Sequence, residues 1–549
     1  MSLFRKKPLD GAVAPEGEIH GGDTLGRHLT VRDLTFFGIA AIIGAGSFSS
    51  MGEACFKGGP GVVLLFVMCG IACGFTALCY AEFAARVPAS GSAYTYAYVT
   101  FGELFAWVIG WALLMEYSIG NIYVAFSWSG YFTNLMEGLG LHLPEWLTIN
   151  YRSASRAFAE GTAGEGLAAW NNAPRLGGLR IIFDLPAVAI NVLITWLVYV
   201  GVKESRNVSN AMVILKLAII VLVVFVGAAY VDIDNWTPFL PNGFGGVMAG
   251  VSAVFFAYIG FDAVSTLAEE SKDPQRDLPR GMIRSLVICT AVYVLLALVL
   301  TGMVNWSQLD VSDPLAEVFQ LRGVKWMLYI VSIAAVVAMT SVLLVFQLGQ
   351  PRIWMSMSRD GLLPKKFASI HPKHRTPGFS TIVTGLVVGL PIFFTDESFI
   401  LDFTSIGTLF AFVLVCGGVL LLPQRPREKG RFHLPYFNSR WTAPLLLVGV
   451  VLLLVMTIPD YFPGLLDIEG HAAQNIPQLI FWPMALVLVI MAHLKQWSLI
   501  PLLGLLSCSY LLTGMEVSNW SWFSVWLVIG LVCYFAYGYR HSKLAPSRP

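Results

Sequence analysis

The feature that most constrains this chain is a long series of apolar segments. Fourteen segments have about 18 or more mostly apolar residues, enough for a helix to cross about 30 Å of hydrocarbon. They lie near residues 33 to 56, 60 to 85, 103 to 135, 183 to 201, 209 to 231, 243 to 268, 283 to 304, 326 to 356, 379 to 395, 400 to 423, 442 to 459, 477 to 494, 498 to 515 and 520 to 539. Hydrophobic residues make up 56% of the chain and charged residues only 13%, far from the composition of a soluble domain. We therefore predict an all-α polytopic membrane protein with about 14 transmembrane helices.

The distribution of Lys and Arg predicts the orientation. With the N-terminus inside, 27 of the 35 basic residues lie on the inner side, 7 on the outer side and one within a span. Cytoplasmic loops carry such an excess. Residues 1 to 30 are polar and contain no short apolar core, so no cleavable signal peptide is expected. We predict a protein of the plasma (inner) membrane with two cytosolic tails, residues 1 to 30 and 540 to 549.

One outer loop, residues 137 to 182, is long and holds four of the 7 outer charges. It is rich in Gly and Ala and shows no clear hydrophobic period. We expect a loose cap or a surface for a partner. The sequence does not decide between these two, and it names no protein partner.

Composition and motifs exclude several classes of protein. The net charge of +1 indicates no nucleic-acid partner. The sequence contains no metal-ligand cluster, nucleophile motif or phosphate-binding loop, so we expect neither an enzyme nor a metal or other cofactor. Most of the eight cysteines lie inside spans, which indicates packing residues rather than disulfides. A nutrient sensor would need a signalling domain, and only about 30 residues precede the first span.

Two spans are interrupted near their middles. The first contains "IIGAGSF", residues 42 to 48, and the sixth contains "FFAYIGFD", residues 255 to 262. Breaks at matching places five spans apart indicate two inverted repeats with a substrate site between them, although small residues also serve helix packing. The expected organisation is repeat 1 over residues 31 to 231, repeat 2 over residues 243 to 423, and helices 11 to 14 over residues 442 to 539.

Unwound backbone at the two breaks predicts a site for a zwitterion. The freed amides of the first break belong to Gly44, Ala45 and Gly46. With the positive end of the following half-helix, they favour a carboxylate. The freed carbonyls of the second break lie near Phe256, Ala257 and Ile259. Carbonyl oxygens accept hydrogen bonds from an ammonium group. An α-amino acid carries both groups.

Ionisable residues in mid-membrane are functional hypotheses, because an unpaired charge there is costly. They are Glu116, Lys216 and Asp262. Lys216 could extend its side chain to the inner interface; alternatively, burial disfavours the charged form of a lysine, and the residue could couple proton movement to transport. Glu116 could bond neighbouring helices or line the cavity. Glu82 and Glu269 lie nearer the inner ends, where we expect solvation or pairing with Arg86 or Lys272.

Several motifs resemble one known family. "IIGAGSF", "CYAEFAARVPASGSAYTYAYVTFGELFAWVIGW", "FFAYIGFDAVSTLAEESKDPQRDLPRGM" and "MSRDGLLP" are similar to the amino acid, polyamine and organocation (APC) transporter superfamily. The chain most resembles its cationic amino acid transporter subfamily, of bacterial type, over about residues 30 to 540. This resemblance implies a LeuT-like (APC) fold of two inverted five-helix repeats plus four C-terminal helices, with alternating access of a central site.

The resemblance also implies roles for particular residues. The substrate carboxylate would lie against the unwound first helix, at Ile43, Gly44, Ala45 and Gly46, and the ammonium against Phe256, Ala257 and Ile259, with the Phe256 ring as a gate. Lys216 matches a lysine that stands where sodium-coupled relatives hold an ion. Glu116 matches a glutamate of the third helix.

Two departures bear on the substrate. Ser47 replaces an isoleucine and adds a hydroxyl beside the site. Phe346 stands where members with cationic substrates carry a small residue, so its ring would shorten the pocket and favour small or medium neutral amino acids; Glu116 argues for a cationic side chain. We predict an L-amino acid permease in the lipid bilayer, driven by proton symport with the proton as coupling ion. The alternatives are exchange of amino acids or of an amino acid for a polyamine, and a sensor that does not transport.

Overall fold

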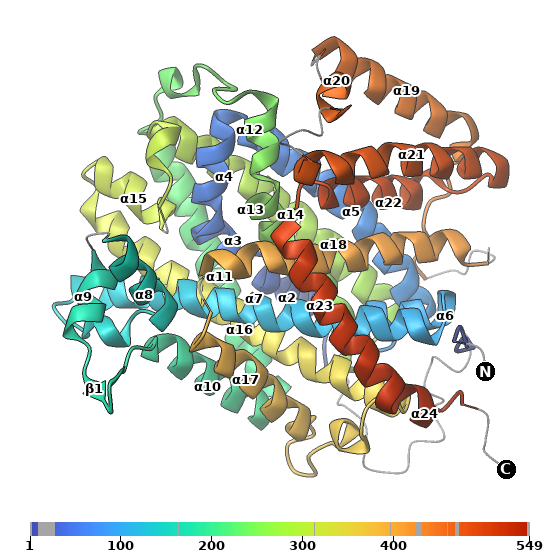
Figure 1. Ribbon diagram of the computed structural model, residues 1–549, viewed down its shortest axis with the longest axis horizontal. Helices are drawn as coiled ribbons and strands as arrows, with labels where there is room; N and C mark the ends of the chain where they lie inside the picture. The colour runs from blue at the N-terminus through green and yellow to red at the C-terminus, as the bar shows by residue number, and fades with distance from the viewer. Residues whose placement is uncertain are drawn as a thin grey trace.

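The computed structural model describes residues 3–8, 28–161, 164–311, 313–395, 397–423, 431–457, 459, 461–466, 472–515 and 517–545. Much of the expected N-terminal tail, residues 9–27, and the last four residues of the C-terminal tail lie outside the described residues. The described chain is almost wholly helical (Figure 1). Within the described residues, ten helices are long and apolar enough to cross a membrane, and three shorter apolar helices accompany them. The fold is therefore that of a polytopic all-α membrane protein, as predicted.

Every expected span is occupied by helix, while the count of fourteen crossings stays a prediction. The first five spans correspond to α2 (Val31–Ile42) with α3 (Ala45–Phe48) and α4 (Ser50–Gly58), α5 (Val62–Arg86), α7 (Glu103–Gly138), α10 (Leu185–Val200) and α11 (Val202–Ala228). The next five correspond to α12 (Gly243–Ala249) with α13 (Val251–Tyr258) and the 3-10 helix η4 (Phe261–Glu270), α14 (Pro274–Met303), α16 (Lys325–Arg359), α17 (Gly378–Ile392) and α18 (Glu397–Leu421). The last four correspond to α19 (Ser439–Thr457), α21 (Ala472–Lys495), α22 (Leu499–Leu512) and α23 (Val517–Cys533).

Shorter elements connect these helices. They are α6 (Ala93–Thr100), α15 (Pro314–Leu321), α20 (Tyr461–Leu466), a π-helical turn (Tyr534–Gly538) and α24 (Tyr539–His541). Short 3-10 helices complete the set at Gly59–Gly61, Ile233–Trp236, Trp306–Gln308 and Lys365–Ala368.

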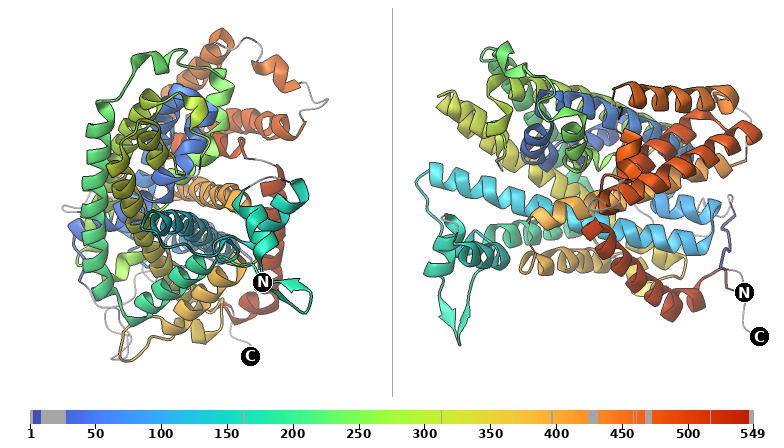
Figure 2. Two further views of the ribbon diagram at one scale, coloured as in Figure 1. Left: turned by 90° about the vertical axis from the view of Figure 1, so that its left-hand side faces the viewer. Right: turned by 45° about the horizontal axis from the view of Figure 1, so that its top comes forward.

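The third and sixth helices form the interior of the bundle. The apolar stretches of Val251–Glu270 and Glu103–Gly138 are 94% and 89% buried, against 11% for Ser439–Met456. Figures 1 and 2 place α19 and α21 at the edge of the molecule. Leu445 and Met456 of α19 are 74% and 81% exposed, as apolar side chains facing lipid are. The helices that carry the predicted site are thus enclosed by protein, and the C-terminal helices are peripheral.

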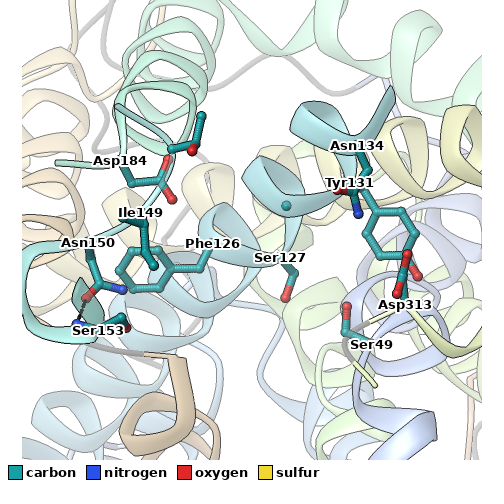
Figure 3. A pocket seen from close by; sticks show the side chains of 12 residues that line it. Ser49, Phe126, Ser127, Tyr131, Asn134, Ile149, Asn150, Ser153, Asp184 and Asp313 are labelled. Atoms are coloured by element: carbon teal, nitrogen blue, oxygen red, sulfur yellow. Dashed lines mark hydrogen bonds between the residues drawn. The ribbon is translucent and has the colours of Figure 1, made fainter. Parts of the chain in front are cut away.

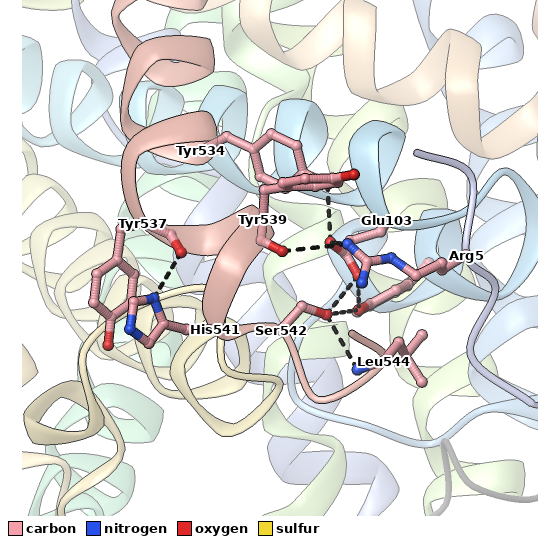
Figure 4. Close-up of polar contacts among 9 residues, drawn as sticks. Arg5, Glu103, Tyr534, Tyr537, Tyr539, His541, Ser542 and Leu544 are labelled. Carbon is pink, nitrogen blue, oxygen red and sulfur yellow. Dashed lines mark hydrogen bonds and ion pairs between the residues drawn. The ribbon is translucent and has the colours of Figure 1, made fainter. Parts of the chain in front are cut away.

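The two ends of the chain meet on one face of the bundle (Figures 1 and 4). Glu103, the first residue of α7, is fully buried and accepts hydrogen bonds from Arg5 (3.0 Å), Tyr98 (3.0 Å), Tyr534 (2.8 Å) and Ser542 (2.5 Å). Four donors satisfy a carboxylate whose burial would otherwise be costly. We call this side the termini face. The cytosolic position of both ends stays a prediction.

The long loop of residues 137 to 182 lies at the opposite end, which we call the insert face (Figure 2). It contains η2 (Glu145–Leu147), α8 (Tyr151–Glu160), α9 (Glu165–Asn172) and the antiparallel ribbon β1 (Arg175–Leu176) and β2 (Leu179–Arg180). A small core of Ala154, Ala169, Ala173 and Ile182 holds it together. Trp170 stacks on Phe158 at 5.3 Å between ring centroids and lies 4.6 Å below the Arg180 guanidinium. The expectation of a loose cap is therefore wrong. The insert is made compact by aromatic packing, and this packing produces no hydrophobic period in the sequence.

Candidate functional site

The first predicted break is present. Helix α2 ends at Ile42, Ile43 is extended (φ −82°, ψ 102°), and α3 begins at Ala45. A Cβ atom on Gly44 would lie 2.2 Å from Val342 of α16. Glycine at this position therefore lets the broken backbone contact α16 directly, and the first amides of α3 have no acceptor within that helix.

The second break faces the first. Helix α13 ends at Tyr258, Ile259 is extended, and Gly260 has φ 115°, which favours glycine. A Cβ atom on Gly260 would lie 2.7 Å from the Cβ of Ala41, and one on Gly46 would lie 2.4 Å from the Cα of Ala257. Each glycine thus packs against the other broken helix, and the two unwound segments lie side by side.

Tyr293 of α14 joins the two breaks, a contact that the sequence analysis missed. Its hydroxyl lies 2.7 Å from the Ile42 carbonyl oxygen and 2.8 Å from that of Ala257. A hydroxyl has one hydrogen to donate, so it serves one carbonyl at a time. The Ala257 carbonyl, expected to receive the substrate ammonium, therefore already has a donor beside it. An uncharged tyrosine in an apolar span gives no signal in the sequence.

Lys216 contacts the first break. Its side chain is fully buried in the bundle. The Nζ atom donates to the carbonyl oxygens of Ile43 (2.5 Å) and Ala40 (3.1 Å) and to the Ser341 hydroxyl of α16 (2.9 Å). These contacts use all three donors of an ammonium group. The side chain does not extend to the membrane interface, so that alternative is wrong. Ser341 is a second residue that sequence reasoning missed.

Ser47, next to the first break, bonds to the backbone of that break. The Ser47 hydroxyl donates to the Gly44 carbonyl at 2.9 Å, a local bond that turns it away from a neighbouring ligand. The side chain of Ala45 lies outside the described residues, and only its backbone is placed. In α13, the Phe256 ring meets the Tyr123 ring edge-on, with centroids 4.7 Å apart. This aromatic pair connects α7 with the second break.

Glu116 lies beside another acid and away from the lysine. Its side chain is 1% exposed, and Thr408 is its hydrogen-bonding neighbour in the described chain. Its electrostatic neighbour is Asp262, whose Oδ2 accepts from Tyr117 at 3.2 Å and whose carboxyl group also has backbone hydrogen-bond neighbours at Gly260 and Ala263. The bonds of Lys216 go to helix α2 and Ser341 instead. The structure thus assembles two buried acids in one region of the core.

Phe346 fills the space between α16 and α7. It is 2% exposed, its ring centroid lies 5.4 Å from that of Tyr117, and a Cβ on Gly120 would meet the ring at 3.1 Å. Gly120 is one helical turn from Glu116. The ring therefore leaves no room for a side chain at Gly120, and its role in setting the depth of the substrate pocket stays a prediction.

Comparison with known proteins decides the family. The sequence profile of amino acid permeases matches residues 29–491, and that of the C-terminus of these permeases matches residues 498–542. The chain belongs to the amino acid permease family. It is a transporter of the APC superfamily and not an enzyme.

Three relatives illustrate the range of this family. The permease is similar to the branched-chain amino acid permease BcaP of Bacillus subtilis, with 38% identity over 99% of each chain. It is similar to the methylthioribose transporter of the same organism, with 39% identity over 83% of this chain and 93% of the relative. It is also similar to human cationic amino acid transporter 4, with 31% identity over 98% of this chain and 90% of the relative.

Two ion pairs fasten the second broken helix of this permease to α16 near the termini face. Arg352 is 1% exposed and donates to Glu270 through Nε at 2.7 Å and through a second nitrogen. Arg359 contacts Glu269 at 2.9 Å. Glu269 thus has Arg359 as a partner in place of the expected Lys272, because η4 runs alongside α16. Glu82 pairs with Arg86 at 2.7 Å, as expected.

Breaking the buried pair should destabilise the permease strongly. Arg352→Gln leaves Glu270 buried without its charged partner, which costs about 3–5 kcal/mol. We expect a large fall in melting temperature of the purified protein in detergent. The control is Arg359→Gln in the pair with side chains 35% and 28% exposed, where the loss should stay below about 1 kcal/mol. Equal melting temperatures for both variants would contradict the role given to the Arg352 pair.

Proposed function

We propose that this permease is a proton-coupled symporter that accumulates small or medium neutral L-amino acids by alternating access. The termini face would lie in the cytosol and the insert face outside the cell, in the plasma membrane. The observation that carries the proposal is the position of Lys216, whose Nζ links the unwound first helix, through Ala40 and Ile43, to Ser341 of α16. A single proton on this group therefore affects the contact between two helices that line the site.

The coupling follows from the count of donors. A protonated lysine has three N–H groups, and all three are used here. The neutral amine has two N–H groups and a lone pair, so loss of the proton either releases one of the carbonyls of Ala40 and Ile43 or makes the Ser341 hydroxyl turn from the Ala338 carbonyl to donate to the amine. Proton occupancy then shifts the population between a state in which the first helix is held against α16 and a state in which it is free to move.

The substrate would lie at the two breaks. The amides at Gly44 to Gly46 suit a carboxylate, since helix N-termini favour anions. The ammonium would lie against the backbone near Phe256 and Ile259, and Tyr293 would exchange its contact with Ala257 as the substrate arrives. Glu116 and Asp262 offer a second place for a proton or a cationic group, since buried carboxyl groups without a described cationic partner are costly when charged.

The identity of the relatives supports an amino acid and leaves its class to be tested. One relative is named for branched-chain amino acids and another for cationic ones. Phe346 supports the neutral class, because its ring narrows the space between α7 and α16 at Gly120.

Removing the Phe346 ring should therefore enlarge the range of substrates. We expect Phe346→Gly to raise uptake of arginine relative to leucine by about tenfold or more, the range for a change in pocket volume. The measurement is competition between the two labelled amino acids in proteoliposomes. Phe394→Gly, which removes a ring that is 75% exposed, should leave the ratio unchanged. An unchanged ratio in Phe346→Gly would remove this residue from the specificity site.

The proposal as a whole is tested by uptake into proteoliposomes with and without an inward proton gradient. The panel contains neutral and cationic amino acids, a polyamine and methylthioribose, the last because a relative at 39% identity is named for it. We expect a neutral amino acid to accumulate only with the gradient. Flux that requires internal substrate would indicate an exchanger, binding without flux would indicate a sensor, and accumulation of methylthioribose alone would overturn the amino acid assignment.

A further inference from the structure

A polar pocket of about 240 Å³ opens on the insert face (Figure 3). It is built from segments far apart in the sequence: the turn after α3, the outer half of α7, the start of the insert and the residues before α10 and α15. Its polar side chains include Ser49, Tyr131, Asn134, Asn150, Asp184 and Asp313. The compact insert thus contributes one wall, which gives this part of the chain a role beyond covering the bundle.

The pocket lies on the path from the insert face to the two breaks. Ser49 directly follows α3, and Tyr131 donates to the Phe48 carbonyl at 2.6 Å. Phe126 lines the pocket one helical turn from Tyr123, whose ring packs on Phe256. The Tyr123 and Phe256 rings therefore stand between this pocket and the second break.

The charge of the pocket suits a cation. Its twelve lining residues include two carboxylates and no basic side chain. Asp184 has a structural task, since its Oδ1 accepts from Ser129 (2.5 Å) and from the Ala187 amide at the start of α10 (2.9 Å). Asp313 has no such capping bond to α15, and burial raises the pKa of its carboxyl group, an effect opposed by a hydrogen bond from Asn134.

A second observation marks the same end of the pocket. The Ser49 hydroxyl is buried, with 6% of the residue exposed, and has no hydrogen-bond partner among the described residues. Figure 3 places Ser49, Tyr131 and Asp313 together at one end, with Phe126 and Ile149 toward the other. A buried hydroxyl without a partner beside a carboxylate leaves an acceptor pair for a ligand with N–H donors.

We propose that this pocket is an outer subsite for a primary ammonium group, at which the amino acid docks on Asp313 and Ser49 before it passes the Tyr123 and Phe256 rings. The inference rests on the proposed amino acid substrate. The aliphatic side chain would lie against Phe126 and Ile149. A transition-metal ion fits less well, because the described residues contain no group of three His, Cys, Asp or Glu side chains that could hold one. The volume suits a ligand below drug size.

A binding experiment tests the subsite without transport. Leucine is compared with isoamylamine, which lacks its carboxylate, and isocaproate, which lacks its amine, as stabilisers of the purified permease against heat. Isoamylamine should stabilise the parent and the control Asp310→Asn, an exposed acid of the same loop, and isocaproate should not. In Asp313→Asn, the concentration of isoamylamine needed should rise about tenfold, because a hydrogen bond to a charged group is lost. The proposal would be overturned if isoamylamine stabilised Asp313→Asn and the parent at the same concentration. It would also be overturned if sodium or calcium stabilised the parent more than the amine does.

A transport experiment separates this inference from the proposed function. Asp313→Asn should raise the KM for leucine uptake about tenfold and leave the maximal rate as in the parent, since docking weakens while the inner site is intact. An unchanged KM, or a loss confined to the maximal rate, would contradict the subsite. If the parent carries no amino acid but isoamylamine still distinguishes Asp313→Asn from Asp310→Asn, the subsite stands and the proposed function fails.

Discussion

Lys216→Met is expected to abolish uphill uptake by this permease. A pH difference of one unit supplies about 1.4 kcal/mol per proton, enough for about tenfold accumulation of a co-transported solute. The methionine keeps a similar apolar length but loses the donors to Ala40, Ile43 and Ser341. The variant should therefore fill proteoliposomes only to the external concentration, whatever the gradient. The measurement is accumulated label with and without an inward proton gradient.

The control for this variant is Lys325→Met. Lys325 begins α16 and is exposed, so its replacement removes the same charge without touching the site, and accumulation should match the parent. To check that Lys216→Met is folded, its binding of the substrate is measured as a rise in melting temperature when the substrate is added. Gradient-driven accumulation equal to that of the parent would leave Lys216 with a structural role only.

Gly46→Ala should inactivate transport through one added methyl group. The new Cβ would lie 2.4 Å from the Cα of Ala257, a backbone atom that no rotamer change can move. Overpacking of this kind costs about 1–3 kcal/mol, and it separates the two broken helices at the site. We expect initial uptake to fall about tenfold or more, since about 1.4 kcal/mol corresponds to a factor of ten.

Gly74→Ala provides the matched comparison. Gly74 lies inside α5, where an added Cβ meets nothing within 4 Å. The same substitution in a membrane helix should then leave uptake and melting temperature near those of the parent. Loss of uptake in both variants would indicate a general intolerance of alanine, and full uptake by Gly46→Ala would contradict the close packing of the two breaks.

Much of the fold can be predicted from the sequence because it is local. Apolar runs of about 20 residues specify membrane helices without reference to anything distant. Gly44, Gly46 and Gly260 mark the breaks because glycine both weakens a helix and permits close approach. The insert could not be predicted in the same way: its core depends on Trp170 meeting Phe158 and Arg180 across two short helices and a ribbon.

The same distinction between local and distant features applies to the site. A buried lysine in an apolar span is visible in the sequence as a costly exception, and so are Glu116 and Asp262. Their partners are not visible. That Lys216 donates to Ile43 and Ser341, and that Glu116 shares its surroundings with Asp262, depends on residues more than 100 positions apart in the chain coming together.

The sequence by itself therefore determined that this chain spans the membrane, that its first and sixth helices are broken, and that a lysine lies within the fifth span. Tertiary structure alone decided that Tyr293 joins the two breaks and that Arg359 forms an ion pair with Glu269. It also decided that residues of the insert and Asp313 line one pocket. The physical reason is that hydrophobicity and backbone freedom are properties of each segment. A hydrogen-bond or ion-pair partner depends on how segments distant in sequence pack against one another.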